Sequence, residues 1–178
     1  MPPMTLWEAI RTQALTTPDA PAVLAHGYPT VTYAAFWQTM QQTVAALRAA
    51  GIGSDDLVAT ALPQGPSAVI VPMAVQAAAG ICPIDPAAPA PDLEADLRAS
   101  GATALLAPAG GPPSLKAAAD CVGIPLIELH EAAAAGEVTF RYAATATLPP
   151  APPAWATAIS PGVVGRTSGT TGIPEWVR

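Results

Sequence analysis

The chain has 178 residues, of which 51% are hydrophobic and 11% are charged, and its formal net charge is −6. This composition supplies enough apolar material for a sizeable core, so it excludes a wholly disordered chain. The 7 lysines and arginines are scattered, and nucleic-acid binding, which needs clustered positive charge, is therefore disfavoured.

Helices and strands alternate along most of the chain. In chain order, the pattern predicts a helix over 6–15, two short strands within 22–33, a helix over 33–51, a strand over 55–62, a helix over 65–80, a strand over 81–85, a helix over 90–101, a strand over 102–108, a helix over 113–123 and a strand over 124–129. The strand over 55–62 shows little polar alternation, as expected when both of its faces are buried. Such alternation predicts an α/β fold with a mainly parallel sheet and helices on both faces.

Prolines interrupt this rhythm after residue 142. Four of them lie between Pro149 and Pro153, and they favour an extended connection over a packed element. The expected organisation is an α/β subdomain over 1–142, a Pro/Ala-rich connection over 143–157, and a strand or loop followed by a glycine-rich loop over 158–178. The stretch VVGR, residues 163–166, fits a short strand or a loop equally well.

The sequence shows neither a signal peptide nor an apolar stretch long enough to span a membrane. The first ten residues lack the basic region and apolar core of a signal peptide. The longest apolar stretch, 68–84, is shorter than the roughly 20 residues of a bilayer span and contains Pro72 and Gly80. Cys82 and Cys121 have no metal-ligand spacing, so we expect a reduced, cytoplasmic setting, no membrane span and no metal site.

The most informative stretch is TSGTTG, near the end of the chain. Its glycines allow a close approach of ligand to backbone, and successive backbone N–H groups of such a loop can form an anion-binding nest. Four hydroxyl side chains add small donors. Neither a Walker loop nor a dinucleotide fingerprint is present, and composition alone leaves a plain Ser/Thr/Gly surface turn as an equal alternative.

The surrounding residues resemble one family. RTSGTTGIP, residues 166–174, resembles the phosphate-loop signature T-S-G-T-T-G-x-P-K of AMP-forming adenylating enzymes, which include acyl-CoA synthetases, peptide-synthetase adenylation domains and luciferase. TVTYAAF, residues 30–36, and the long stretch 62–106, from LPQGP to GATALL, are similar to two earlier segments of that family. The resemblance covers nearly the whole chain in the family's order.

The resemblance implies a fold, a reaction and a set of binding residues. Members activate a carboxylic acid with Mg-ATP to an acyl-adenylate and pass the acyl group to coenzyme A or a carrier thiol. Their N-terminal region is a large α/β unit, and the matching loop closes on the β- and γ-phosphates. By this resemblance, the residues that contact the ATP phosphates are Thr167, Ser168, Gly169, Thr170, Thr171 and Gly172.

Two departures from the family pattern stand out. Glu175 occupies the position where the family usually has lysine, which places like charge near a polyanion. At a separation of about 5 Å and an effective dielectric of 20, the repulsion between one pair of like unit charges is worth roughly 3 kcal/mol. The repulsion falls to about 1 kcal/mol or less if the side chain faces solvent. The sequence also stops shortly after Gly172, so the magnesium-binding acid and the catalytic lysine of the family cannot be placed, and we expect no catalytic residue here.

Two functions remain as hypotheses. The first is the N-terminal portion of an ATP-dependent carboxylate ligase, inactive alone. The second is a truncated, non-catalytic homologue that acts as a dimerising or partner-binding module, through a surface that truncation exposes. Among other candidates, His26, His130 and Asp85 are read as structural or surface residues, Cys82 as an inert core residue, and Trp7 and Trp37 as core.

Overall fold

The computed structural model describes residues 5–134, 137–144, 163–166 and 176–177. In chain order the elements are α1 (Leu6–Thr16), β1 (Pro21–Val23), β2 (Val31–Thr32), α2 (Tyr33–Ala49), β3 (Leu57–Thr60), α3 (Pro66–Gln76), β4 (Gly80–Pro83), α4 (Ala90–Ser100), β5 (Ala104–Pro108), α5 (Pro113–Val122), β6 (Leu126–Ala134), β7 (Glu137–Ala144), β8 (Gly165–Arg166) and β9 (Trp176–Val177). Each predicted helix and strand is therefore confirmed, and β7 and β9 are elements that were not predicted.

Helix ends follow the residues that the sequence offers. Thr5 caps α1 in a capping box, in which its side chain accepts from the backbone N–H of Glu8 and the Glu8 carboxylate accepts from the Thr5 backbone N–H. After α2, Gly51 takes φ +85°, a left-handed conformation that costs glycine little. Pro66 occupies the first turn of α3, where its missing N–H removes no helical bond.

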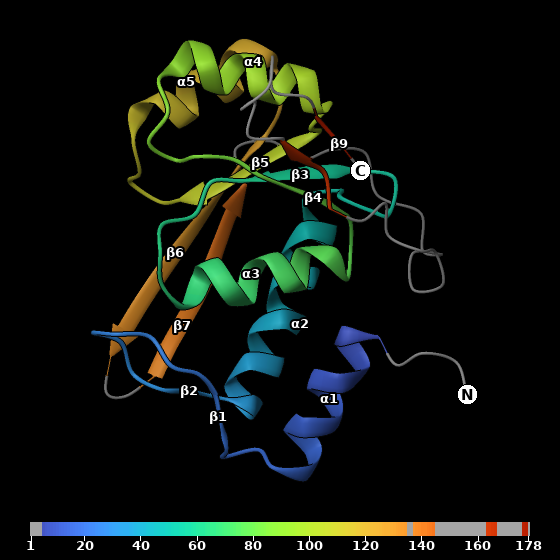
Figure 1. Cartoon of the computed structure of the whole chain (residues 1–178), viewed down its shortest axis with the longest axis vertical. Coiled ribbons are helices and arrows are strands. Elements are labelled where there is room, and N and C mark those ends of the chain that lie inside the picture. The colour runs from blue at the N-terminus through green and yellow to red at the C-terminus, as the bar shows by residue number, and fades with distance from the viewer. Residues whose placement is uncertain (1–4, 135–136, 145–162, 167–175, 178) are drawn as a thin grey trace.

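The central sheet has the strand order β4-β3-β5-β6-β7. Its first four strands are parallel, and β7 pairs antiparallel with β6. Figure 1 shows α4 and α5 on one side of the sheet and α1, α2 and α3 on the other. The predicted fold class, a mainly parallel sheet with helices on both faces, is confirmed.

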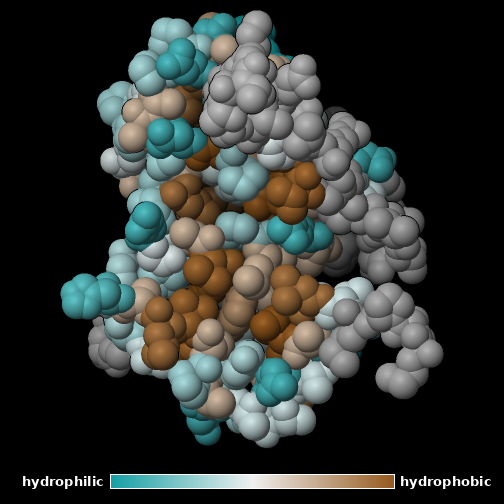
Figure 2. Space-filling view, in the orientation of Figure 1, coloured by the Kyte–Doolittle hydropathy of each residue, from teal (hydrophilic) through white to brown (hydrophobic). Residues whose placement is uncertain are grey.

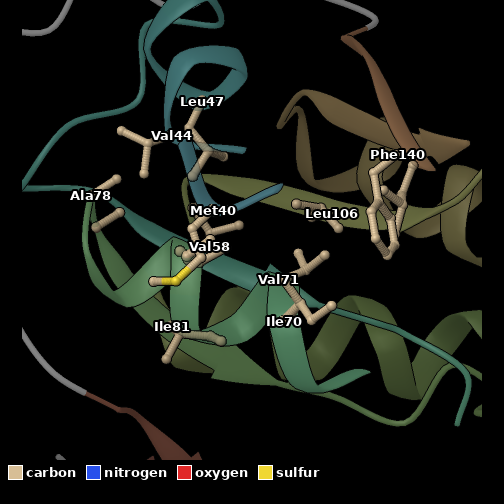
Figure 3. Packing of buried hydrophobic residues seen from close by; sticks show 14 of the residues in the cluster. Met40, Val44, Leu47, Val58, Ile70, Val71, Ala78, Ile81, Leu106 and Phe140 are labelled. Atoms are coloured by element: carbon tan, nitrogen blue, oxygen red, sulfur yellow. The ribbon is translucent and has the colours of Figure 1, made fainter. Parts of the chain in front are cut away.

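Each face of the sheet has its own apolar cluster. Along β5, Leu106 belongs to the cluster under α1–α3, and Leu105 belongs to the cluster under α4 and α5. Alternate residues of a strand point to opposite faces, so a strand covered on both sides is apolar throughout. Figure 3 shows the first cluster, to which α2 contributes Met40 and Leu47 and β7 contributes Phe140.

The antiparallel strand β7 completes one edge of the sheet. It runs through Ala143 and Ala144, the first two residues of the range expected for the connection, while residues 145–162 lie outside the described part of the chain. Phe140 is buried, and Tyr142 packs against the α1–α3 cluster. The alternation of Val138, Phe140 and Tyr142 with polar residues is the sequence signal that could have identified this strand.

Candidate functional site

The six residues assigned to ATP phosphates, 167–172, and Glu175 lie outside the described residues. The structure does describe the chain on both sides of this loop. Before it, Gly165–Arg166 forms β8, and after it, Trp176–Val177 forms β9. The two strands are antiparallel, with Gly165 opposite Val177 and Arg166 opposite Trp176, so the entrance and exit of the loop are neighbours.

The entrance of the loop is attached to the central sheet. Val163 makes a parallel bridge with Ile81 of β4, and the Val164 backbone N–H donates to the Ile81 carbonyl oxygen at 2.8 Å. Val164 is buried in the cluster under α4 and α5. Because this segment runs parallel to β4, the chain leaves it toward the carboxyl edge of the parallel strands.

That edge is where open α/β sheets bind their ligands. The order β4-β3-β5 also makes β3 and β5 a switch point, because the chain leaves β3 toward α3 on one face and leaves β5 toward α5 on the other. The loop stem lies beside β4, the next strand along. The position of the stem therefore agrees with a ligand-binding role for residues 167–172.

The other polar candidates hold local structure. The Asp85 carboxylate accepts from the Ala87 backbone N–H at 2.9 Å, and the Asp56 carboxylate accepts from the Gly53 backbone N–H at 2.8 Å. Both are turn contacts, and for Asp85 this agrees with the structural role expected from the sequence. His26, in the turn between β1 and β2, and His130, in β6, are both exposed. Within the described residues, neither belongs to a group of His, Cys, Asp and Glu side chains that could hold a metal.

The prediction that Cys82 is a core residue is confirmed, whereas Trp7 and Trp37, predicted as core, are only partly buried and pack against the core. Cys82 is fully buried in β4, and burial raises the pKa of its thiol to about 11, so it stays protonated and unreactive at neutral pH. Trp7 and Trp37 pack edge to face, with ring centroids 4.5 Å apart, beside the α1–α3 cluster. None of the described helices is long and apolar enough to cross a membrane.

Sequence reasoning left one part of the site undecided. It gave no preference between strand and loop for 163–166, whereas the structure places Val163 and Val164 against β4 and Gly165–Arg166 in β8. Pro161 and Gly165 weaken the strand pattern around these residues. The signal that favours sheet contact is the pair of β-branched valines.

Comparison with solved structures identifies the fold. One similar structure is the o-succinylbenzoate coenzyme A synthetase MenE from Bacillus subtilis, solved in complex with AMP. Its TM-score is 0.62 at 19% sequence identity, and the match covers 96% of this chain and 41% of the MenE chain. IdnL1 has a TM-score of 0.59 at 23% identity, over 83% of this chain and 28% of its own. The fold is that of the N-terminal region of adenylate-forming enzymes.

A third structure is somewhat nearer in sequence. The nonribosomal peptide synthetase FmoA3 (S1046A), in its AMPPNP-bound form, has a TM-score of 0.65 at 26% identity, over 99% of this chain and 17% of its own. The chain thus spans less than half the length of each of these three solved chains. No curated protein matches it. The model of the AMP-binding enzyme family matches residues 10–177, and the chain belongs to that family.

Proposed function

We propose that the chain supplies the N-terminal part of an ATP-dependent ligase that activates a carboxylic acid as an acyl-adenylate. Residues 167–172 would bind the β- and γ-phosphates of ATP through backbone N–H groups and hydroxyls. The observation that carries the proposal is that the family match extends through this loop to residue 177. The attachment of its stem beside β4 supports the same assignment.

The remaining chemistry belongs to regions that these 178 residues do not span. The chain covers 41% of MenE and 17% of FmoA3, so the acid pocket, the acceptor site for coenzyme A or a carrier thiol, and the catalytic groups are not assigned here. Magnesium would arrive with ATP and neutralise phosphate charge. We assign it no protein ligand, and we keep a reduced, cytoplasmic setting as part of the proposal.

Phosphate binding is tested by calorimetry with MgATP and with pyrophosphate. We expect weak binding of both, because only part of a nucleotide site is present. Gly169→Val should abolish it, since a bulky side chain blocks the approach of phosphate to the backbone. Gly27→Val offers a matched control, because Gly27 is an exposed turn glycine of the β1–β2 hairpin. Equal affinity of Gly169→Val and wild type would contradict the proposal.

Catalytic incompleteness is tested separately. The 178-residue chain should give no ATP–pyrophosphate exchange with any carboxylic acid, because it covers less than half the length of its solved relatives and we place the other groups that stabilise transition-state charge in the remainder. Exchange that depends on an added acid and clearly exceeds the enzyme-free rate would show that the chain is a complete catalyst.

A second candidate, a module that dimerises with another copy, is favoured by the outer face of α3. This helix contains no charged residue, whereas α4 and α5 carry the ion pairs Glu94–Arg98 and Lys116–Asp120 on their surfaces. Val69 of α3 is 40% exposed, and Met73 is only partly buried. Figure 2 shows hydrophobic side chains gathered on the face that α3 occupies.

Exposed apolar faces of this kind favour association. Light scattering should therefore show a dimer that Val69→Lys weakens. Lys116→Val, on the outer face of α5, serves as a control on the opposite side of the sheet. A wild-type chain that stays monomeric at every concentration tested would remove this second candidate.

A further inference from the structure

We propose that the N-terminus of α3 binds the carboxylate group of a small organic acid, with Ser67 as the residue that holds it. The site contains none of residues 167–172, and it does not depend on their proposed function. Two independent observations carry the proposal. One is a backbone donor that the first turn of α3 leaves unused, and the other is a buried serine hydroxyl in that turn without a hydrogen-bond partner.

The first turn of α3 leaves a backbone donor unused. The N-cap residue is Gly65, and no described side chain caps the helix. Pro66 has no N–H, and the Ala68 N–H donates to the Gly65 carbonyl oxygen at 3.2 Å. The Ser67 N–H is therefore the first N–H of α3 without an acceptor inside the helix. Aligned peptide dipoles make this end of a helix favourable for negative charge.

The second observation is the hydroxyl of Ser67. Ser67 is only 1% exposed, and its Oγ atom has no hydrogen-bond partner among the described residues. A serine inside a helix commonly donates to a carbonyl three or four residues earlier, as Ser100 does to the Leu97 carbonyl oxygen at 3.2 Å. Ser67 makes no such bond. A buried hydroxyl without a partner costs stability, so local structure does not explain this one.

The Ser67 side chain is directed toward the same end of the helix. Each Cα–Cβ bond of an α-helix tilts toward the N-terminus, and Ser67 lies in the first turn of α3. Ile70 and Val71, three and four residues later, are buried in the α1–α3 cluster, which places Ser67 on the side of α3 that faces the sheet. The N–H and O–H of Ser67 thus lie at the carboxyl end of β3, where α3 begins.

A further buried hydroxyl lies at this end of the sheet. Thr60 is the last residue of β3 and is 4% exposed. Val58 belongs to the α1–α3 cluster, and alternate residues of a strand point to the same face, so the Thr60 side chain also faces the side of α3. Thr60 and Ser67 are two of the five buried polar residues in the described part of the chain. Polar groups therefore gather where α3 begins.

These groups favour a carboxylate over a phosphate. The N–H and O–H donors can each bond to a carboxylate oxygen, whereas a doubly charged phosphate loses more hydration energy when it enters a buried site. The chain reaches solvent close to Ser67, since Gln64 is exposed and Gly65 is partly exposed. The Tyr28 hydroxyl lies 3.2 Å from the position that a Cβ on Gly65 would occupy. It adds one more donor on this side, from which we expect the carboxylate to enter.

An NMR titration of the amide resonances with sodium acetate tests the site, with sodium chloride holding the ionic strength constant. We expect the Ser67 amide to shift progressively and saturate, and the Gly123 amide at the end of α5 to stay unmoved. Ser67→Ala removes the hydroxyl and should weaken acetate binding about tenfold, because one hydrogen bond to a charged group is lost. Ser67→Cys, a weaker donor, should also weaken acetate binding.

Ser100→Ala is the matched control, because Ser100 is a buried serine whose hydroxyl has a partner. This variant should lower the urea midpoint of unfolding and keep the acetate affinity within about twofold. Ser67→Ala, without acetate, should unfold at the same urea concentration as wild type or at a higher one, because its hydroxyl has no bond to lose. One variant therefore loses affinity and the other loses stability.

Four results would overturn the inference. They are a Ser67 amide that acetate does not shift, wild-type acetate affinity in Ser67→Ala, an equal loss of affinity in Ser100→Ala, and a clear loss of stability in acetate-free Ser67→Ala. Phosphate that binds this site more tightly than acetate would overturn the choice of a carboxylate. Binding of MgATP or pyrophosphate by residues 167–172 is measured separately, so failure here leaves the proposed function intact.

Discussion

The contact between β7 and α2 allows a sharp test of the packing. Tyr142 and Thr43 share a hydrogen bond between their side-chain oxygens. The Thr43 hydroxyl also donates to the Thr39 carbonyl oxygen at 2.8 Å. Since that bond uses the only proton of the Thr43 hydroxyl, the Tyr142 hydroxyl is the donor to Thr43.

The two substitutions that break this bond should have unequal costs. Tyr142→Phe removes the donor and leaves Thr43 bonded to Thr39, so we expect the free energy of unfolding to fall by about 1 kcal/mol. Thr43→Val keeps the shape of the side chain but leaves a partly buried phenol hydroxyl without a partner, which costs about 2 kcal/mol. Thr43→Val is therefore expected to be the more destabilising variant.

The same residue predicts a dependence on alkaline pH. Burial, the largest cause, raises the pKa of Tyr142 to about 12, from 10.0 for a free tyrosine. Because the pKa of Tyr142 is higher in the folded state than in the unfolded state, the contribution of protonated Tyr142 to stability is present in full below pH 10. This contribution is lost as pH rises toward 12. We expect a loss of about 2 kcal/mol across this window, allowing for the partial exposure of Tyr142.

Urea unfolding at pH 7 and at intervals between pH 9 and 12 measures both effects. Tyr142→Phe should be less stable than wild type at pH 7 and should lose stability less steeply above pH 10. If Tyr142→Phe is more destabilising than Thr43→Val at pH 7, or if its alkaline profile matches wild type, the assignment of donor and burial is wrong.

Three further predictions concern separate parts of the chain. Leu97 is fully buried in the cluster under α4 and α5, so Leu97→Ala should lower the free energy of unfolding, measured in urea, by about 2–5 kcal/mol. Leu15 is 72% exposed, so Leu15→Ala should change the free energy of unfolding by about 0.5 kcal/mol or less. Thr5→Ala removes the capping box with Glu8 and should cost about 1 kcal/mol in the same assay. Glu175→Lys should improve MgATP affinity several-fold in calorimetry, by about 1 kcal/mol, and the gain should shrink as salt rises; equal affinities at low salt would count against a phosphate near Glu175.

The predictable part of the fold is the part with local signals. The spacing of apolar residues predicted α2, and Gly51 and Gly101 mark where α2 and α4 end. The apolar runs of β3 and β5 predicted strands buried on both faces, because helices cover both sides of the sheet. In these segments local preference and tertiary packing agree.

What could not be predicted depends on partners far away in the sequence. β7 lies at the sheet edge because its side chains meet α2, and the bond between Tyr142 and Thr43 joins residues 99 positions apart. The docking of Val164 depends on Ile81 and α4. No local pattern shows which edge of a sheet a short segment will join, so the location of the loop stem required the structure.

Binding of the ATP phosphates to residues 167–172 can be observed residue by residue in an NMR titration of the amide resonances with pyrophosphate. The amides of Gly169 and Gly172 should shift progressively and saturate. Gly101 and Gly123, at the ends of α4 and α5, should stay unmoved as internal controls. Shifts that spare residues 167–172, or that move all four glycines alike, would contradict the claim.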